Sequence, residues 1–230
     1  MKINRLSLRE GAYAAHGTAV IIDVFRAFTC EPLMYHYGAE KVCLEGDIDR
    51  CLKMRGDAIL IGEHNVVPIE GFDLTNSPRM IMERGRSFFG GRTVIHRTTS
   101  GVTGALAAME HADEVLLASY ANAKATAAYI ARENPAEVSI VGMGIRSMAN
   151  APEDDFCGDY IEHLLNGRHY DHIEALRTIL VHETAQKFIR GDKIYLPRED
   201  PAICLQRDMF DFALRAEKGT DFVEARRVTV

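Results

Sequence analysis

Six short apolar runs, separated by longer helix-like stretches, constrain the fold of this chain more than any other feature. The runs are rich in aliphatic residues and lack in/out alternation, which is typical of strands buried on both faces of a sheet. They lie at residues 18–23, 41–44, 58–62, 92–95, 114–118 and 137–142. The stretches between them predict helices at 27–37, 48–55, 76–84, 103–111 and 122–133. This alternation predicts an α/β fold, a three-layer α/β/α sandwich with a largely parallel sheet.

The sequence changes character after Gly144. We expect a helix from Glu153 to Leu165, because its apolar residues fall on one face, and Gly167 can end it. The rest of the chain looks mainly helical. No linker, repeat or low-complexity stretch divides the sequence, so we expect residues 1–230 to form a single domain.

Composition and charge argue against several classes of protein. The net charge is -6 and the basic residues are scattered, so we expect no nucleic-acid partner. No apolar run reaches the length of a membrane span, and Met1–Arg5 leads into no signal core, so we expect a cytoplasmic protein. The five cysteines are odd in number and form no Cys-x-x-Cys pair, which argues against a disulfide framework or zinc knuckle. A homodimer is only a general expectation for such a chain.

Polar residues follow the first and third predicted strands, at the sheet edge where α/β proteins bind ligands. Asp23 could hold a hard cation and Arg26 could grip an oxyanion with two nitrogens, or the two could be a helix cap and a solvated charge. Glu63 ends the third strand, and the loop beyond it carries Glu70 and Asp73. That loop could bind a ligand or simply form a turn. Either Asn76 or Ser77 could cap the helix that follows it.

Two further segments carry groups suited to an anion or a cation. The fourth strand runs into Thr98-Thr99-Ser100-Gly101, where hydroxyls and a helix start could cradle an anion, or form an ordinary turn. Glu153-Asp154-Asp155 begins a helix, where acidic residues complement the helix dipole or serve as metal ligands. Carboxylates without clustered His or Cys favour Mg²⁺ over zinc. Cys157 follows them, and we expect a small buried hydrophobe there and not a nucleophile.

Taken together, these segments resemble the 2-phosphosulfolactate phosphatase family. The resemblance runs from about Ala19 to about Leu165, and its most specific block is Ile69-Glu70-Gly71-Phe72-Asp73-Leu74-Thr75-Asn76-Ser77-Pro78. The other matching segments are 22–27, 62–63, 98–101 and 153–157. The family is Mg²⁺-dependent and is associated with coenzyme M biosynthesis.

The resemblance implies a Mg²⁺-dependent phosphatase domain that hydrolyses the phosphate ester of a small 2-hydroxy acid carrying a second anionic group, such as 2-phosphosulfolactate. Mg²⁺ would neutralise phosphoryl oxygens and activate water. The expected metal ligands are Asp23, Glu70, Asp73, Glu153 and Asp154. The expected catalytic residues are Asp23, Arg26 and Glu63, with the general base left open between the two carboxylates. The expected substrate-binding residues are Arg26, Asn76, Ser77, Thr98, Thr99, Ser100 and Gly101.

The sequence departs from the family pattern in places. The family usually has Arg where His64 stands, Asn where Ser100 stands and Thr where Val102 stands. It usually has Ala-Gly in place of Gly158-Asp159. We expect the first three departures to fall in the anion site and to affect the choice of substrate more than the type of reaction.

Two other functions fit the same residues. One is a different Mg²⁺-dependent enzyme on this scaffold that acts on another phosphorylated or carboxylated acid. The other is a non-enzymatic module that binds a small anion. The retained acidic residues argue against the module, because an anion binder without a metal has no use for several carboxylates.

Overall fold

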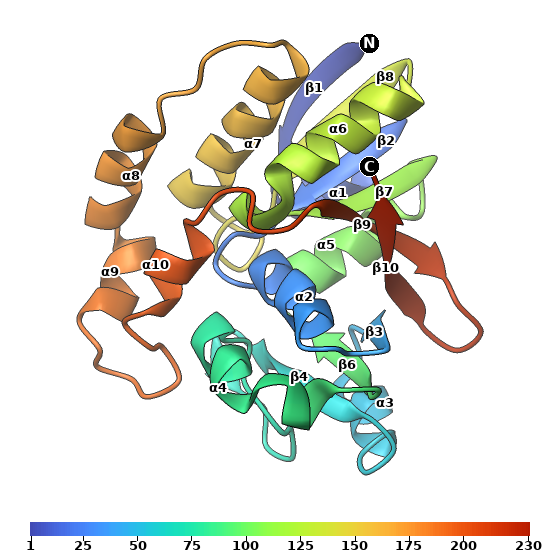
Figure 1. The fold of residues 1–230 in the computed structure, drawn as a ribbon, viewed down its shortest axis with the longest axis vertical. Helices are drawn as coiled ribbons and strands as arrows, with labels where there is room; N and C mark the ends of the chain where they lie inside the picture. Colours follow the sequence, from blue (N-terminus) through green and yellow to red (C-terminus); the bar gives the residue numbers. More distant parts are fainter.

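The strands form one sheet of ten, in the order β1-β8-β2-β7-β9-β10-β3-β6-β4-β5. The computed structural model describes residues 1–230, and Figure 1 shows its fold. The strands are β1 (Lys2–Ser7), β2 (Thr18–Ile22), β3 (Lys41–Leu44), β4 (Ile59–His64), β5 (Val67–Pro68), β6 (Thr93–Arg97), β7 (Glu114–Ala118), β8 (Glu137–Gly142), β9 (Phe212–Lys218) and β10 (Val223–Thr229).

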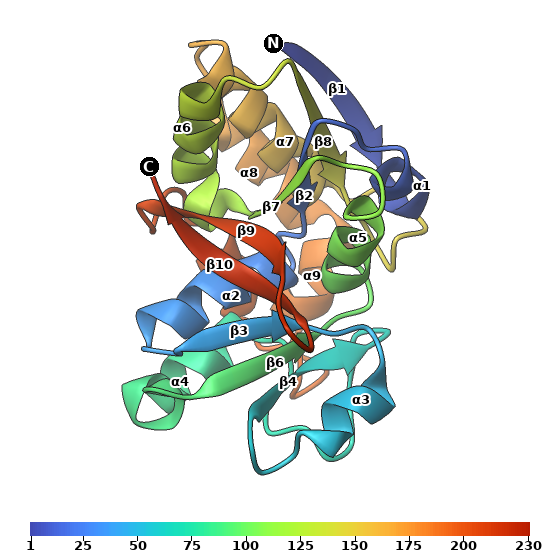
Figure 2. The same cartoon turned by 90° about the vertical axis from the view of Figure 1, so that its right-hand side faces the viewer.

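The sheet consists of two parallel blocks joined by an antiparallel hairpin. One block contains β1, β8, β2 and β7, and the other contains β3, β6 and β4. The hairpin of β9 and β10 lies between them, with β9 antiparallel to β7 and β10 antiparallel to β3. Figure 2 shows this hairpin crossing the middle of the molecule, with one block on either side of it. Residues from the end of the chain therefore complete the centre of the sheet.

Helices cover both faces of the sheet. They are α1 (Leu8–Tyr13), α2 (Ala27–His36), α3 (Ile48–Lys53), α4 (Pro78–Phe89), α5 (Gly101–Ala108), α6 (Ala123–Glu133), α7 (Pro152–Leu165), α8 (His172–Val181), α9 (Glu183–Ile189) and α10 (Asp200–Cys204), with a 3₁₀ turn η1 (Tyr120–Asn122). Strand β2 shows the layering most clearly. Ala19 and Ile21 pack with α1, α2 and α5 on one face, whereas Val20 and Ile22 pack with α6 and α7 on the other. This arrangement confirms the predicted three-layer α/β/α sandwich.

The predicted strands and helices are confirmed, although their ends differ by several residues in places, as in α4, which runs to Phe89 and not to residue 84. Helix α1 and the short strand β5 were not predicted. Strand β1 had no prediction. The expectation of a mainly helical last third is right for α8, α9 and α10 but missed the β9–β10 hairpin. The hairpin reads Phe-Ala-Leu-Arg-Ala-Glu-Lys and Val-Glu-Ala-Arg-Arg-Val-Thr. Its Ala, Arg, Glu and Lys residues favour helices locally, and pairing with β7 and β3 overrides that preference.

Two expectations about the chain as a whole can be compared with the structure. None of the helices has both the length and the apolar character needed to cross a membrane. All five cysteines are free thiols, and all five are buried.

Candidate functional site

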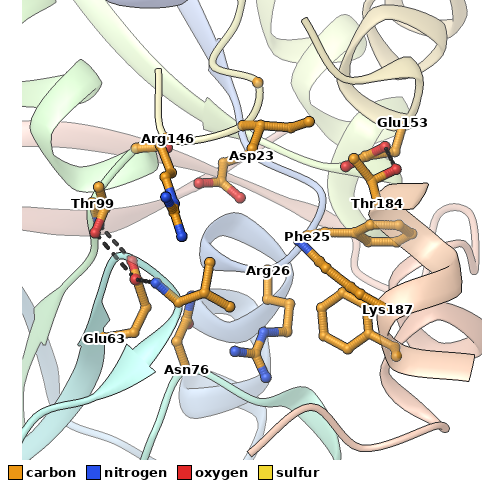
Figure 3. Close-up of a pocket in the computed structure, with 15 residues that line it drawn as sticks. Asp23, Phe25, Arg26, Glu63, Asn76, Thr99, Arg146, Glu153, Thr184 and Lys187 are labelled. Carbon is orange, nitrogen blue, oxygen red and sulfur yellow. Dashed lines mark hydrogen bonds between the residues drawn. The ribbon is translucent and has the colours of Figure 1, made fainter. Parts of the chain in front are cut away.

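A polar cavity lies where the carboxyl ends of β2, β4, β6 and β8 meet (Figure 3). The loops after these strands form most of its wall, and α9 closes one side with Thr184, Lys187 and Phe188. The polar side chains of the wall are Asp23, Arg26, Glu63, Asn76, Thr99, Ser100, Arg146, Glu153, Thr184 and Lys187. Both parallel blocks of the sheet thus contribute to one site.

Two buried carboxylates in the cavity are held with pKa values well above their usual range. Burial raises the pKa of Asp23 to about 6, although its Oδ1 accepts a 3.2 Å hydrogen bond from the Ala27 amide. Burial also raises the pKa of Glu153 to about 7, and the nearby charge of Asp23 adds to the shift. Glu153 Oε2 accepts a 2.7 Å hydrogen bond from the Thr184 hydroxyl. A cation would relieve the cost of ionising both groups in so little water.

Asp154 sits behind this pair and connects two loops. Its Oδ1 accepts a 2.8 Å hydrogen bond from the Val24 amide, and its Oδ2 accepts a 2.7 Å bond from the Gly144 amide. Burial and the neighbouring Asp23 raise its pKa, whereas the two amides oppose that shift. Because both oxygens face backbone amides and the side chain does not line the cavity, Asp154 fixes the loops after β2 and β8.

Glu63 connects the loops after β4 and β6. Its Oε1 accepts a 2.6 Å hydrogen bond from the Thr99 amide, and its Oε2 accepts from the Val66 amide and, at 3.1 Å, from the Thr99 hydroxyl. Figure 3 shows these bonds as dashed lines. Both carboxylate oxygens of Glu63 therefore accept hydrogen bonds that hold the two loops of the cavity wall together.

Gly101 lets α5 start close to Asp23. A Cβ atom at this position would lie 2.7 Å from Ala27 Cβ and 2.9 Å from Asp23 Oδ2, so any larger residue would displace one of them. The Gly101 amide also donates a hydrogen bond to Asp23, which opposes the rise of its pKa. Because Gly101 has no side chain, the first turn of α5 can lie directly against the Asp23 carboxylate.

Arg26 is aimed by a buried aspartate from the far end of the chain. Its Nη1 donates a 2.8 Å hydrogen bond to Asp200 Oδ2 and a 3.1 Å bond to the Tyr195 carbonyl oxygen. The other oxygen of Asp200 accepts from the Ser77 hydroxyl at 2.9 Å and from the Arg79 amide at 3.0 Å. The remaining guanidinium nitrogens of Arg26 make no hydrogen bond within the protein, and Arg26 lines the cavity. They are free to receive an anion.

Asn76 belongs to a buried chain of three polar side chains. Its Oδ1 lies 3.0 Å from His96 Nε2, and His96 Nδ1 lies 2.8 Å from Glu31 Oε1. His96 and Glu31 are completely buried, whereas Asn76 reaches the cavity wall. Burial raises the pKa of Glu31, and its hydrogen bond with His96 opposes that rise.

Lys187 and Arg146 bring two further positive charges to the cavity. Neither side chain forms an ion pair or a hydrogen bond with the protein, although Lys187 Nζ lies 5.2 Å from the centre of the Phe188 ring. Burial lowers the pKa of Lys187, and Glu153 opposes that shift. Unpaired cations beside two carboxylates make a site that can receive a multiply charged anion together with a cation.

The family model described as 2-phosphosulpholactate phosphatase matches residues 5–218. The chain belongs to this family. Among its curated relatives is a probable 2-phosphosulfolactate phosphatase of Bacillus subtilis (strain 168), 28% identical over 92% of each chain. Another probable 2-phosphosulfolactate phosphatase, from Clostridium perfringens (strain SM101 / Type A), is 30% identical over 87% of this chain and 86% of its own. Membership places the chain among phosphatases, which are hydrolases.

The structure brings together some of the residues expected from the phosphatase resemblance and leaves others outside the cavity. Asp23, Arg26, Glu63, Asn76, Thr99, Ser100 and Glu153 all line it. Glu70 and Asp73 are exposed and lie outside the lining, and Asp73 Oδ2 accepts a 2.8 Å hydrogen bond from the Leu60 amide. Their position does not support a role as metal ligands. No group of three His, Cys, Asp or Glu side chains is assembled to hold a metal ion.

Three of the expected substrate-binding residues support the wall without lining it. The Ser77 hydroxyl donates to Asp200 and accepts from the Met80 amide at the start of α4. The Thr98 hydroxyl accepts a 3.0 Å hydrogen bond from the Val102 amide. Gly101 provides space beside Asp23. None of the three lines the cavity, so contact with a substrate stays a prediction for them.

Only one of the three departures from the phosphatase pattern lies in the cavity. Ser100 lines it, and its hydroxyl makes no hydrogen bond with the protein. Val102 is buried in the core, and His64 is exposed outside the cavity lining. The expectation that all three fall in the anion site is wrong for Val102 and His64. Val102 packs into the core from the first turn of α5, and His64 is exposed at the end of β4.

Sequence reasoning missed several residues of the site. Arg146 follows the end of β8, so the rule that ligands bind beyond strand ends could have found it. Thr184, Lys187 and Asp200 lie in the helical last third, where nothing local in the sequence indicates a site. His96 and Glu31 are internal positions of β6 and α2, where a polar residue is visible in the sequence but its partner is not.

Proposed function

We propose that this phosphatase hydrolyses the phosphate ester of a small acid that carries at least one further anionic group, with 2-phosphosulfolactate as the leading substrate and Mg²⁺ as cofactor. The observation that carries the proposal is a cavity with two carboxylates of raised pKa and three cationic side chains, Arg26, Arg146 and Lys187. The names of the relatives support the same substrate.

The carboxylates fit a magnesium ion. Mg²⁺ in phosphoryl-transfer sites is bound through one or two carboxylates, with water and substrate phosphate completing its coordination. Asp23 would hold it, because its buried carboxylate is stabilised by two backbone amides and faces the cavity. When bound, the ion neutralises charge on the phosphoryl oxygens and lowers the pKa of water.

The protein's own residues divide the remaining tasks. Arg26, fixed by Asp200, donates to the phosphoryl oxygens. Glu153 takes up the proton of the attacking water, because a general base works best when its pKa, here about 7, lies near the ambient pH. Lys187 and Arg146 bind the second anionic group of the substrate. Glu63 positions Thr99 and so preserves the shape of the wall.

Phosphate release tests the proposal directly. The chain is assayed on 2-phosphosulfolactate, other phosphorylated 2-hydroxy acids and a neutral aryl phosphate, each with Mg²⁺ and with excess EDTA. We expect turnover that is fastest on the acidic substrates, disappears in EDTA and returns with added Mg²⁺. Undiminished turnover in EDTA would remove the metal from the mechanism.

Matched variants separate the cavity carboxylates from those outside it. Asp23→Asn and Glu153→Gln should each lower kcat by about a hundredfold or more, since each removes a group from the reaction. Glu70→Gln is the control, because Glu70 is exposed and does not line the cavity. A loss with Glu70→Gln as large as that with Asp23→Asn would place the metal in the outer loop.

Ser100 favours a second candidate, a Mg²⁺-dependent phosphatase of the same type with a different small acid as substrate. A shorter hydroxyl stands in the cavity where the family usually has Asn, so the space and the hydrogen bonds offered to the substrate differ. Ser100→Asn should then raise kcat/KM for 2-phosphosulfolactate relative to the other acids of the panel.

A further inference from the structure

We infer that Glu31 and His96 act as positioning residues that turn the Asn76 side-chain NH₂ group into the cavity, where it donates a hydrogen bond to the phosphoryl group beside Arg26. This inference rests on the proposed function, because it assumes that the cavity receives a phosphoryl group. Asn76 touches the ligand, whereas Glu31 and His96 act through it.

The orientation of an Asn amide depends on what its partner donates. Asn76 Oδ1 faces His96 Nε2, so this oxygen is held only while Nε2 carries a proton. The Asn76 nitrogen makes no hydrogen bond within the protein, yet it is not among the buried polar atoms without a partner. It is therefore open to the cavity that Asn76 lines. If Nε2 were unprotonated, the amide would turn over and present its oxygen to the substrate, which would repel an anion.

Glu31 keeps the proton on His96 Nε2. Both side chains are completely buried, and Glu31 Oε2 has no hydrogen-bond partner, so an extra negative charge on this pair would be costly. The pair is electrically neutral overall in two ways. Either an ionised Glu31 faces a doubly protonated imidazole, or a protonated Glu31 donates to Nδ1 of a neutral imidazole. In both arrangements His96 Nε2 carries a proton, so both turn the Asn76 nitrogen to the cavity.

Asn76 and Arg26 belong to the same part of the wall. Ser77, the residue after Asn76, donates to Asp200, and Asp200 also binds Arg26. Both of these donors are thus fixed from behind by a buried acid, Arg26 by Asp200 and Asn76 by Glu31 through His96. Two aimed donors are what a phosphoryl group in a low-dielectric site requires.

Two variants of His96 separate positioning from simple packing. The side-chain nitrogen of Gln reaches the place of Nε2, whereas the side chain of Asn reaches only the place of Nδ1. We expect His96→Gln to keep the donation to Asn76, and His96→Asn to lose it while keeping its contact with Glu31. Both remove part of a buried ring, so any general loss of packing should be similar in the two.

The measurement is the Kd for inorganic phosphate in the presence of Mg²⁺, by titration calorimetry. We expect His96→Asn to weaken binding about tenfold or more, and His96→Gln to stay within about threefold of the unchanged protein. Equal weakening in both variants would overturn the inference. The assay needs no turnover, so its result is independent of whether the unchanged protein hydrolyses 2-phosphosulfolactate.

A spectrum of the unchanged protein provides a check that does not depend on how the variants fold. Multiple-bond ¹⁵N–¹H NMR of the histidine rings reports which ring nitrogens carry protons, and the missing signals of His96→Gln identify His96. We expect a proton on Nε2. An unprotonated Nε2 would overturn the inference, because Asn76 would then turn its oxygen to the cavity.

Discussion

At the scale of single residues, Asp23 and Glu153 make the stability of the fold depend on pH. Their pKa values are about 6 and about 7 in the folded chain, against 3.8 and 4.5 without a fold. Between about pH 4 and pH 7 the folded chain therefore binds more protons than the unfolded chain. The contribution of this pair to the free energy of unfolding falls as the pH rises through that window. Above pH 7 both carboxylates are ionised, and the loss of stability from burying their charges is complete.

This linkage predicts that a variant without activity is more stable at high pH. Asp23→Asn removes one buried charge, so it should raise the stability at pH 8 by roughly 1–3 kcal/mol, and by much less at pH 5. Thermal unfolding in EDTA at the two pH values measures the difference. Glu70→Gln, on the surface, should shift neither value. A stability gain at pH 5 as large as that at pH 8 would contradict the assignment of a raised pKa.

Substitution of Arg26 can separate the effect of its positive charge from the effect of its planar hydrogen-bonding geometry. Arg26→Lys keeps a positive charge beside Asp200 but loses the planar fork, so the fold should survive while kcat/KM falls by roughly a hundredfold. The loss should be equal on 2-phosphosulfolactate and on a neutral aryl phosphate, because the proposed function assigns Arg26 to the phosphoryl group that both share. A loss confined to the acidic substrate would move Arg26 to the second anion. Arg26→Ala is a poorer probe, since it leaves Asp200 buried without its partner.

For single residues, a position in the cavity could be predicted from the sequence only where the residue follows the end of a strand. Asp23, Arg26 and Thr99 follow strand ends in a parallel sheet, and the general rule for such sheets was enough to place them together. Glu70 and Asp73 lie in the block most specific to the family, yet they do not line the cavity. A motif records which residues recur, and it does not separate those that touch a ligand from those that shape a loop.

At the scale of elements, α9 brings a positive charge to the cavity from outside the sheet. Lys187 from this helix lines the cavity and has no partner in the protein. Lys187→Met keeps an apolar chain of similar length beside Phe188 and removes the charge. We expect KM for 2-phosphosulfolactate to rise about tenfold or more, with little change for a neutral aryl phosphate, since one charge-assisted contact is lost.

Lys193→Met is the matched control for that substitution. Lys193 is exposed in the loop after α9 and does not line the cavity, so its removal changes the net charge equally without touching the site. A comparable rise in KM for both variants would mean that long-range charge attracts the substrate, and would remove Lys187 from contact with it. Repeating the comparison at high salt separates the two effects, because salt screens only the long-range one.

Strands that are buried on both faces of the sheet were predicted well from the sequence. The β9–β10 hairpin, which pairs with strands far away in the sequence, was missed. The parallel strands are apolar throughout, so their sequence alone separates them from the helices around them. β9 mixes apolar and charged residues without a regular pattern, and it pairs with β7 about a hundred residues earlier, as in the Leu116–Arg215 register. Nothing in a local stretch of sequence reports such a partner.

At the scale of the whole molecule, the five thiols report on the integrity of the fold. All five are buried, and burial raises the pKa of each. We therefore expect Ellman's reagent at pH 8 to label none of them in the folded chain and all five in guanidinium. Cys157→Ser should also keep most of the phosphatase activity, because a buried thiol of raised pKa is no nucleophile. Rapid native labelling, or loss of activity in a folded Cys157→Ser, would contradict this.

The central hairpin also governs when the molecule can become whole during synthesis. The ribosome makes β7 and β3 long before β9 and β10, so the nascent chain holds two half-sheets, each with an unpaired edge. Such edges invite pairing with other chains, and they stay open until residues 212–229 emerge. Until then helix packing, as by α2, is what the two halves share, and no strand pairing joins them. The cavity is therefore among the last features to form, and a chain released early would carry the cavity residues on two half-sheets without strand pairing between them.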